Sequence, residues 1–246
     1  YHIIVYTIIW YYCIMGDPDV LEIIEINNKI IIDELNDFYK NRELITIVGK
    51  GESAKYISYG IAINQSLLFT NKKVVFMNDF ESCFGIEQYL KDIQYLFIPY
   101  YPHIKCKAHP DFTYVLIQNY ANKYGFKGKI FVYQLSTTFN KNILKDYFLS
   151  APSTTGTAIL FFHKFLQKTF FEFYGVSKGV LYHPHLLQLD FSTIKENNLY
   201  QDLFDKYIPF FLSNFNYSLQ SCSGNHDRFG RFIKKLKSKN ISLTFY

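Results

Sequence analysis

Three short stretches decide the fold of this chain: LITIVGKGES at residues 44–53, GIAINQ at 60–65 and KVVFMN at 73–78. Each contains an apolar run that ends at a glycine or an asparagine. A short apolar run bounded by turn residues is typical of a strand that is buried on both faces. The sequence therefore predicts three buried strands in close succession.

Helical patterns alternate with these strands along the rest of the chain. Helices are expected at 18–41, 112–124 and 227–238, and a long one from Ser153 to about Tyr174. Further strands are expected at about 95–98, 129–133, 180–182 and 241–246. Alternating apolar strands and helices predict an α/β fold with an open, mainly parallel, Rossmann-like sheet and helices on both faces.

The chain of 246 residues has a suitable length for one domain, and no Pro/Gly-rich linker divides it. We expect a single α/β domain over 1–246, with 1–42 as an N-terminal extension and 183–222 as a smaller lid or acceptor region. The first 15 residues are apolar but too few for a spanning helix. They are interpreted as a buried strand.

Composition excludes several classes of protein. Hydrophobic residues make up 49% and charged residues 19%, which argues against disorder. The net charge of +5 is too small to indicate nucleic-acid binding. One basic run is interpreted as the solvated face of a helix, with contact to an anionic membrane or acceptor as the alternative: Arg228, Arg231, Lys234, Lys235, Lys237 and Lys239.

The four cysteines lie far apart and form no CxxC pair. This spacing indicates neither a zinc cluster nor a disulfide framework, so a reducing compartment is expected. We therefore predict a cytoplasmic protein, with a peripheral position on the inner face of the membrane as the alternative.

Polar groups follow the first three strands where each one ends. The glycine turn at 49–53 precedes a short helix and has the form of a phosphate cradle, although a purely structural turn is the alternative. Asn64-Gln65 and Asn78 follow the next two strands, and amides suit a pyrimidine ring or a ribose. The alternative is that asparagine only terminates these strands. Since parallel strands end at one edge, the three tips predict a nucleotide site.

These residues resemble a known family. The runs ITIVGKGESAKYI, GIAINQSLLF and KKVVFMNDFESCFG are similar to the start of bacterial sialyltransferases that act on lipooligosaccharide, which carry GNGPS, CNQ and YNPS at these places. In that family the three elements hold the CMP half of CMP-sialic acid. The resemblance covers about 43–182 and the C-terminus, and it implies a metal-independent, inverting transfer of the sugar to a glycan hydroxyl.

Carried over by position, the resemblance assigns a donor site. It implies donor contacts from Gly49, Lys50, Gly51, Ser53, Asn64, Gln65, Asn78, Thr154, Thr155 and Gly156. The last three match an RITSG segment that opens a helix, but the family's arginine falls on Pro152. Lys50 and Glu52 also replace the family's asparagine and proline, and Tyr182-His183-Pro184-His185 replaces a GID.

A transfer of this kind needs a base for the acceptor hydroxyl and support for the departing phosphate. The resemblance places the base at His226, in the run SGNHD before the last helix, with a helix-cap role as the alternative. Tyr182 or His183 would support the leaving group, and His183 or His185 compete for the base role. No metal site is predicted: His103 and His109, near Cys106, are interpreted as part of a partly exposed surface loop, and Asp79 as a helix cap.

The sequence thus predicts a sialyltransferase-like enzyme that uses a CMP-activated acidic sugar and a glycan acceptor, and no cofactor beyond that substrate. Three alternatives stay open. In the first, the donor is CMP-Kdo or another CMP-nonulosonate. In the second, the chain is a non-catalytic glycan- or nucleotide-binding module of a larger assembly. A methyltransferase is the third, but it would need an acidic residue where Asn64 stands.

Overall fold

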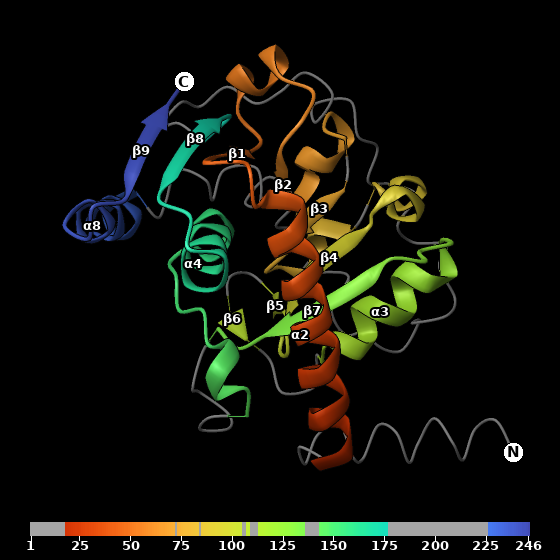
Figure 1. The fold of residues 1–246 in the computed structure, drawn as a ribbon. Coiled ribbons are helices and arrows are strands. Elements are labelled where there is room, and N and C mark those ends of the chain that lie inside the picture. Colours follow the sequence, from red (N-terminus) through yellow and green to blue (C-terminus); the bar gives the residue numbers. More distant parts are fainter. Residues whose placement is uncertain are drawn as a thin grey trace, which may run out of the picture.

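The computed structural model describes residues 18–71, 73–83, 85–104, 107–108, 113–135, 143–176 and 226–246. Within these residues a seven-stranded parallel sheet has the order β7-β4-β3-β2-β1-β8-β9 (Figure 1). Its strands are β1 (Leu44–Val48), β2 (Ile61–Ile63), β3 (Val74–Phe76), β4 (Tyr95–Pro99), β7 (Lys129–Tyr133), β8 (Phe170–Tyr174) and β9 (Ser242–Phe245). Each neighbouring pair runs in the same direction. The predicted open, parallel α/β fold is confirmed.

Helices and one small hairpin complete the described structure. The α-helices are α2 (Pro18–Tyr39), α3 (Tyr114–Lys123), α4 (Thr154–Leu166) and α8 (His226–Lys237). Short 3-10 helices follow several strands: η1 (Glu52–Tyr56), η2 (Asn64–Leu68), η3 (Phe80–Cys83), η4 (Glu87–Asp92) and η5 (Lys145–Tyr147). The hairpin joins β5 (His103–Ile104) to β6 (Lys107–Ala108).

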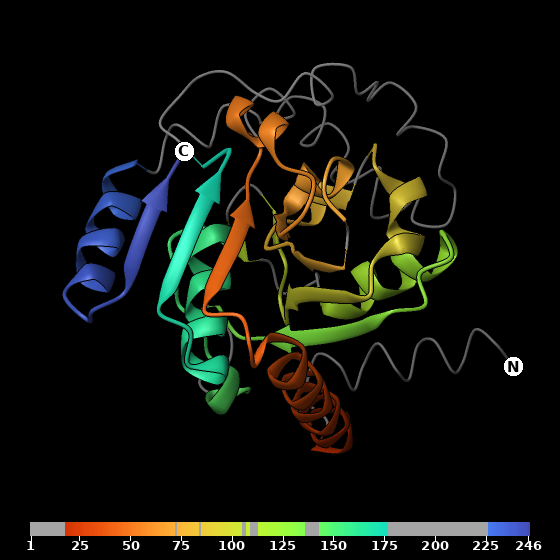
Figure 2. The same ribbon diagram turned by 45° about the horizontal axis from the view of Figure 1, so that its top comes forward.

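The strands are mostly apolar because both faces of the sheet are covered (Figure 2). Side chains alternate between the faces: Val74 and Phe76 of β3 pack with α2 and α4, whereas Val75 and Met77 pack with α3. α8 packs on the first of these faces through Phe232, Ile233 and the buried Leu236. The predicted placement of helices on both faces is confirmed.

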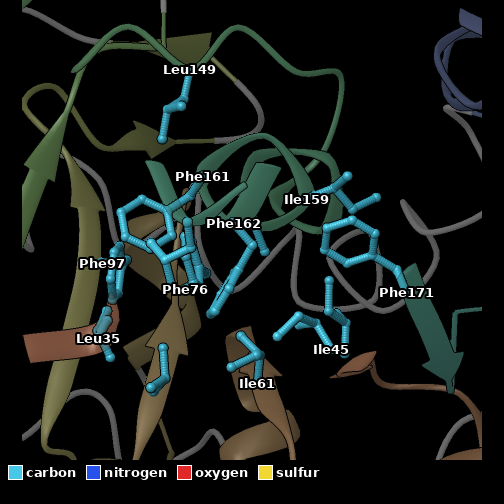
Figure 3. Close-up of a cluster of buried hydrophobic side chains, with 14 of the residues drawn as sticks. Leu35, Ile45, Ile61, Phe76, Phe97, Leu149, Ile159, Phe161, Phe162 and Phe171 are labelled. Carbon is cyan, nitrogen blue, oxygen red and sulfur yellow. The ribbon is translucent and has the colours of Figure 1, made fainter. Parts of the chain in front are cut away.

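Phenyl rings fill the space between α4 and the sheet (Figure 3). Phe161 of α4 lies edge-on to Phe97, with ring centroids 4.6 Å apart, and Phe97 stacks on Phe76 at 4.1 Å. Such ring pairs add roughly 0.5–1.5 kcal/mol beyond the area that they bury. The high aromatic content of the chain is therefore accounted for by its core.

One predicted helix was too long. The helix expected to reach Tyr174 ends at Leu166, and β8 begins at Phe170. Gln167 has a left-handed φ of 55°, and Lys168 N–H donates to Phe162 O at 3.1 Å, which closes the last turn. Phe171 and Phe173 then point into the core as alternate residues of a strand. The strands predicted at 1–15 and 180–182 and the lid at 183–222 lie outside the described residues.

The predicted N-terminal extension includes α2, which covers strand β7 at one end of the described sheet order. The buried Asn28 side chain pairs with the backbone of Val132. Its Nδ2 donates to Val132 O at 2.7 Å, and Val132 N–H donates to its Oδ1 at 3.0 Å. An edge strand leaves such backbone groups without a strand partner, so the amide takes the place of the missing neighbour.

Replacing this amide tests how much the fold depends on α2. We expect Asn28→Ala to lower the free energy of unfolding by about 2–4 kcal/mol, because two buried backbone groups of Val132 lose their partners. Urea denaturation followed by circular dichroism measures the change. Asn27→Ala, at the neighbouring exposed position of the same helix, is the matched control and should stay within about 0.5 kcal/mol of wild type. Equal stability of the two variants would contradict the role of Asn28.

Candidate functional site

The sheet order reverses between β1 and β8. After β1 the chain adds β2, β3, β4 and β7 outward on one side, and then returns to place β8 on the other side of β1. In open α/β sheets, ligands bind beyond the carboxyl ends of the strands at such a switch point. The predicted glycine turn, which follows β1, therefore lies where this rule places a ligand site.

The two turn glycines lie against the backbone of Gly175, directly after β8. A Cβ on Gly49 would lie 2.4 Å from Gly175 O, and one on Gly51 would lie 3.0 Å from the same atom. Gly49 N–H donates to Tyr174 O at 2.7 Å, and Gly51 N–H donates to Gly175 O at 2.8 Å. This packing is a sufficient structural reason for both glycines. Their presence alone is therefore no argument for a phosphate site.

Ser53 and Lys50 belong to the same turn. Ser53 Oγ accepts a hydrogen bond from Gly175 N–H at 2.7 Å and donates one to Tyr246 O at 2.8 Å. Ser53 thus connects the ends of β1, β8 and β9, while Lys50 is buried. The turn predicted as a phosphate cradle joins three strand ends, and its contact with a donor stays a prediction.

The tip after β2 has buried oxygens that accept no hydrogen bond. Asn64 is 9% exposed and Gln65 is 3% exposed. Asn64 Oδ1 and Gln65 Oε1 have no hydrogen-bond partner within the part of the chain that the structure describes. Leaving a buried acceptor unsatisfied costs about 1–3 kcal/mol, and more than nine in ten such groups are paired in proteins. These two amides are therefore candidates for ligand binding.

Backbone geometry supports the same interpretation of this tip. Asn64 has a φ of 54°, in the left-handed region that asparagine adopts more often than other non-glycine residues. Ser66 fixes the tip, since its Oγ donates to Val48 O at 2.5 Å and accepts from Ile63 N–H at 2.7 Å. Uncommon backbone geometry held by its surroundings is concentrated at functional sites.

The Asn78 side chain, in contrast, has partners within the protein. Its Oδ1 accepts a hydrogen bond from Tyr133 Oη at 2.5 Å, and its Nδ2 donates to Thr157 Oγ1 at 3.3 Å. Asn78 therefore joins the end of β3 to β7 and α4. Its contact with the nucleotide or the sugar stays a prediction, and its position at a strand end has a structural explanation.

The first turn of α4 begins at the same edge. Ser153 caps this helix by accepting a hydrogen bond from Gly156 N–H at 3.1 Å. The predicted donor residues Thr154, Thr155 and Gly156 are all buried there. A Cβ on Gly156 would lie 3.0 Å from the Phe232 ring. This glycine therefore allows α8 to approach α4.

The sequence did not predict one pair of titratable residues, Asp79 after β3 and His103 at the start of β5. Asp79 and His103 form a parallel β-bridge. Asp79 was predicted as a helix cap, and it does precede η3, where Ser82 N–H donates to Asp79 O at 3.1 Å. His103 was predicted in a partly exposed surface loop; it is half-buried and opens the short strand β5. No spacing in the sequence signals the pair, because the loop after β4 creates it.

The predicted catalytic residues are only partly described. Tyr182, His183 and His185 lie outside the described residues. His226 is the first residue of α8, and α8 leads through a short turn into β9. Because β9 runs parallel to the other strands, α8 starts toward the carboxyl edge. The backbone of His226 therefore lies toward the carboxyl edge of the sheet.

Comparison with known proteins adds no assignment: no family model, curated protein or solved structure matches this chain. Across the described ranges, no helix is long and apolar enough to cross a membrane. Nor do any three His, Cys, Asp or Glu side chains among the described residues gather in a metal-binding arrangement.

The packing of the glycine turn can be tested with a matched pair of variants. We expect Gly49→Ala to destabilise the protein by about 1–3 kcal/mol, because its methyl group would overlap Gly175 O. Gly230→Ala is the control, since a Cβ in this helical position has nothing within 4 Å. It should be neutral or stabilising by up to about 1 kcal/mol. Urea denaturation measures the free energy of unfolding of both variants. A Gly49→Ala protein as stable as wild type would contradict the packing argument.

Proposed function

We propose that this chain is a glycosyltransferase that moves sialic acid from CMP-sialic acid to a glycan hydroxyl, with inversion and without a metal ion. The proposal combines the resemblance at 43–182 with the observed parallel sheet. Strands β1, β2 and β3 end at one edge, where α4 begins. This is the placement that a nucleotide-sugar site requires.

The observation that carries the proposal is the pair of buried amide oxygens on Asn64 and Gln65. An oxygen that lacks a donor is satisfied by a ligand that brings N–H or O–H groups. Cytidine monophosphate brings both kinds, in the amino group of cytosine and the hydroxyls of ribose. The two buried oxygens would then have one common cause, which is the need to bind this nucleotide.

The proposed reaction divides its tasks among the predicted site residues. Asn64 and Gln65 hold the nucleotide, and the start of α4 with the 49–53 turn lies near the phosphate. His226 is the base that the resemblance implies, with Tyr182 or His183 beside the leaving phosphate. A donor with Kdo or another nonulosonate would use the same nucleotide contacts, and a non-catalytic module would keep those contacts without turnover.

Ligand binding tests this proposal directly. We expect CMP to stabilise the protein by about 2.7 kcal/mol at a concentration 100-fold above its Kd, because it binds the folded state alone. Thermal unfolding with CMP, UMP, AMP and S-adenosylmethionine measures the shift in Tm. The shift should be largest for CMP. No response to CMP would contradict the proposal, and a response to S-adenosylmethionine alone would favour a methyltransferase.

A variant at Gln65 connects binding to the buried oxygens. Gln65→Leu removes an unsatisfied acceptor at nearly constant volume, so we expect the ligand-free protein to be as stable as wild type or more stable. The Tm shift with CMP should be lost. Gln94→Leu changes an exposed glutamine before β4, at the opposite edge of the sheet, and should leave the shift intact. A Gln65→Leu protein that still responds to CMP would exclude this residue from the site.

A further inference from the structure

Asp79 and His103 are held side by side by backbone pairing. Asp79, which follows β3, and His103, which opens β5, are bridge partners, and His103 N–H donates to Asn78 O at 2.7 Å. Partners in a parallel bridge project their side chains to the same face, with strands about 4.8 Å apart. The carboxylate and the imidazole are therefore neighbours at the carboxyl edge.

Electrostatic coupling supports this placement. Burial lowers the pKa of His103 below its ordinary value, while the charge of Asp79 acts in the opposite direction. Burial and the charge of Asp79 also raise the pKa of Tyr133 well above its ordinary value. The ring of His103 is thus neutral at pH 7 and beside a carboxylate. A general base needs a neutral imidazole that can accept a proton. A nearby carboxylate then stabilises the imidazolium that forms.

The surroundings of the pair are fixed. Asn78, next to Asp79, is tied to Tyr133 and Thr157 by the hydrogen bonds given above. η3 packs against β5 and brings the Cys83 thiol, which faces Met77 Sδ at 3.6 Å. The charge of Asp79 thus acts on both the His103 ring and the Tyr133 hydroxyl.

We propose that His103 is the base of the transfer reaction and that Asp79 is its positioning residue. This inference rests on the proposed function. His103 takes the proton of the acceptor hydroxyl as that oxygen attacks the anomeric carbon. The bond from this carbon to the phosphate oxygen breaks, and its electron pair leaves with CMP. Asp79 orients the ring and stabilises the imidazolium.

Position along the sheet favours His103 over His226. The Asn64–Gln65 tip follows β2, and Asp79 follows β3, one strand away at about 4.8 Å. α8, which His226 opens, lies beside β9 (Figures 1 and 2). β9 is four strands from β3 in the sheet order, or about 19 Å. A sugar attached to a nucleotide at the β2 tip is thus next to Asp79 and His103.

Three variants separate the two histidines. CMP binding is measured by the Tm shift, and CMP release from CMP-N-acetylneuraminic acid is measured from pH 5 to 9. We expect His103→Gln to keep the CMP shift and to lose about 10²–10⁴-fold in kcat, the usual contribution of a general base. Asp79→Asn should move the acidic limb of the rate profile to lower pH, because the His103 pKa falls when the carboxylate is removed. His226→Gln tests the rival base that the resemblance implies: loss of turnover in this variant, with His103→Gln unaffected, would return the role to His226.

Each outcome has one meaning. A His103→Gln protein that binds CMP and releases it at the wild-type rate overturns the inference but leaves the proposed function intact. So does an Asp79→Asn profile without a shift, or loss of turnover in His226→Gln alone. If His103→Gln does not bind CMP, His103→Asn takes its place. A wild-type protein that neither binds nor releases CMP overturns both proposals.

Discussion

Parallel pairing of the main sheet is the constraint from which the described architecture follows. Parallel neighbours cannot be joined by a tight turn, so the chain must cross back to the opposite end of the sheet before each new strand. The crossing segments cover both faces, and most strand residues are therefore apolar and alternate between two cores. The same constraint brings every carboxyl end to one edge, where polar side chains from distant parts of the sequence meet.

The reversal of strand order at β1 and β8 creates a second requirement. Their carboxyl ends lie together, and the backbone of Gly175 fills the space that side chains at Gly49 and Gly51 would occupy. The glycine turn is thus explained by the junction of two strands. The buried amide oxygens of Asn64 and Gln65, which accept no hydrogen bond from the described residues, lie at the end of the neighbouring strand β2. A glycine-rich turn at a switch point can therefore serve chain packing while its neighbour supplies ligand contacts.

The sequence was sufficient to predict the strands that are short, apolar and bounded by glycine or asparagine, such as 44–48 and 61–63. It did not reveal β8, because the aromatic residues from Phe170 to Tyr174 continue the apolar sequence pattern of α4. In addition, α4 is capped at its C-terminus by Gln167 and not by the usual glycine. Nor did the sequence reveal Asn28 as the partner of Val132, since that contact depends on where α2 crosses the sheet. In the site, residue types at strand ends were predictable, but the pairing of Asp79 with His103 required the path of the chain after β4.

Asparagine at a strand end has two different meanings in this protein. At Asn78 both ends of the amide are engaged by Tyr133 and Thr157, so the residue holds β3, β7 and α4 together. At Asn64 the amide oxygen is buried without a donor among the described residues, on a backbone with positive φ. Folding alone would select against the second arrangement, because a buried acceptor loses its hydration and gains no bond. Binding of a donor-bearing ligand removes that cost. Asn64 and Gln65 follow β2, and Asp79, the bridge partner of His103, follows the neighbouring strand β3; the proposed function would join these groups in one site.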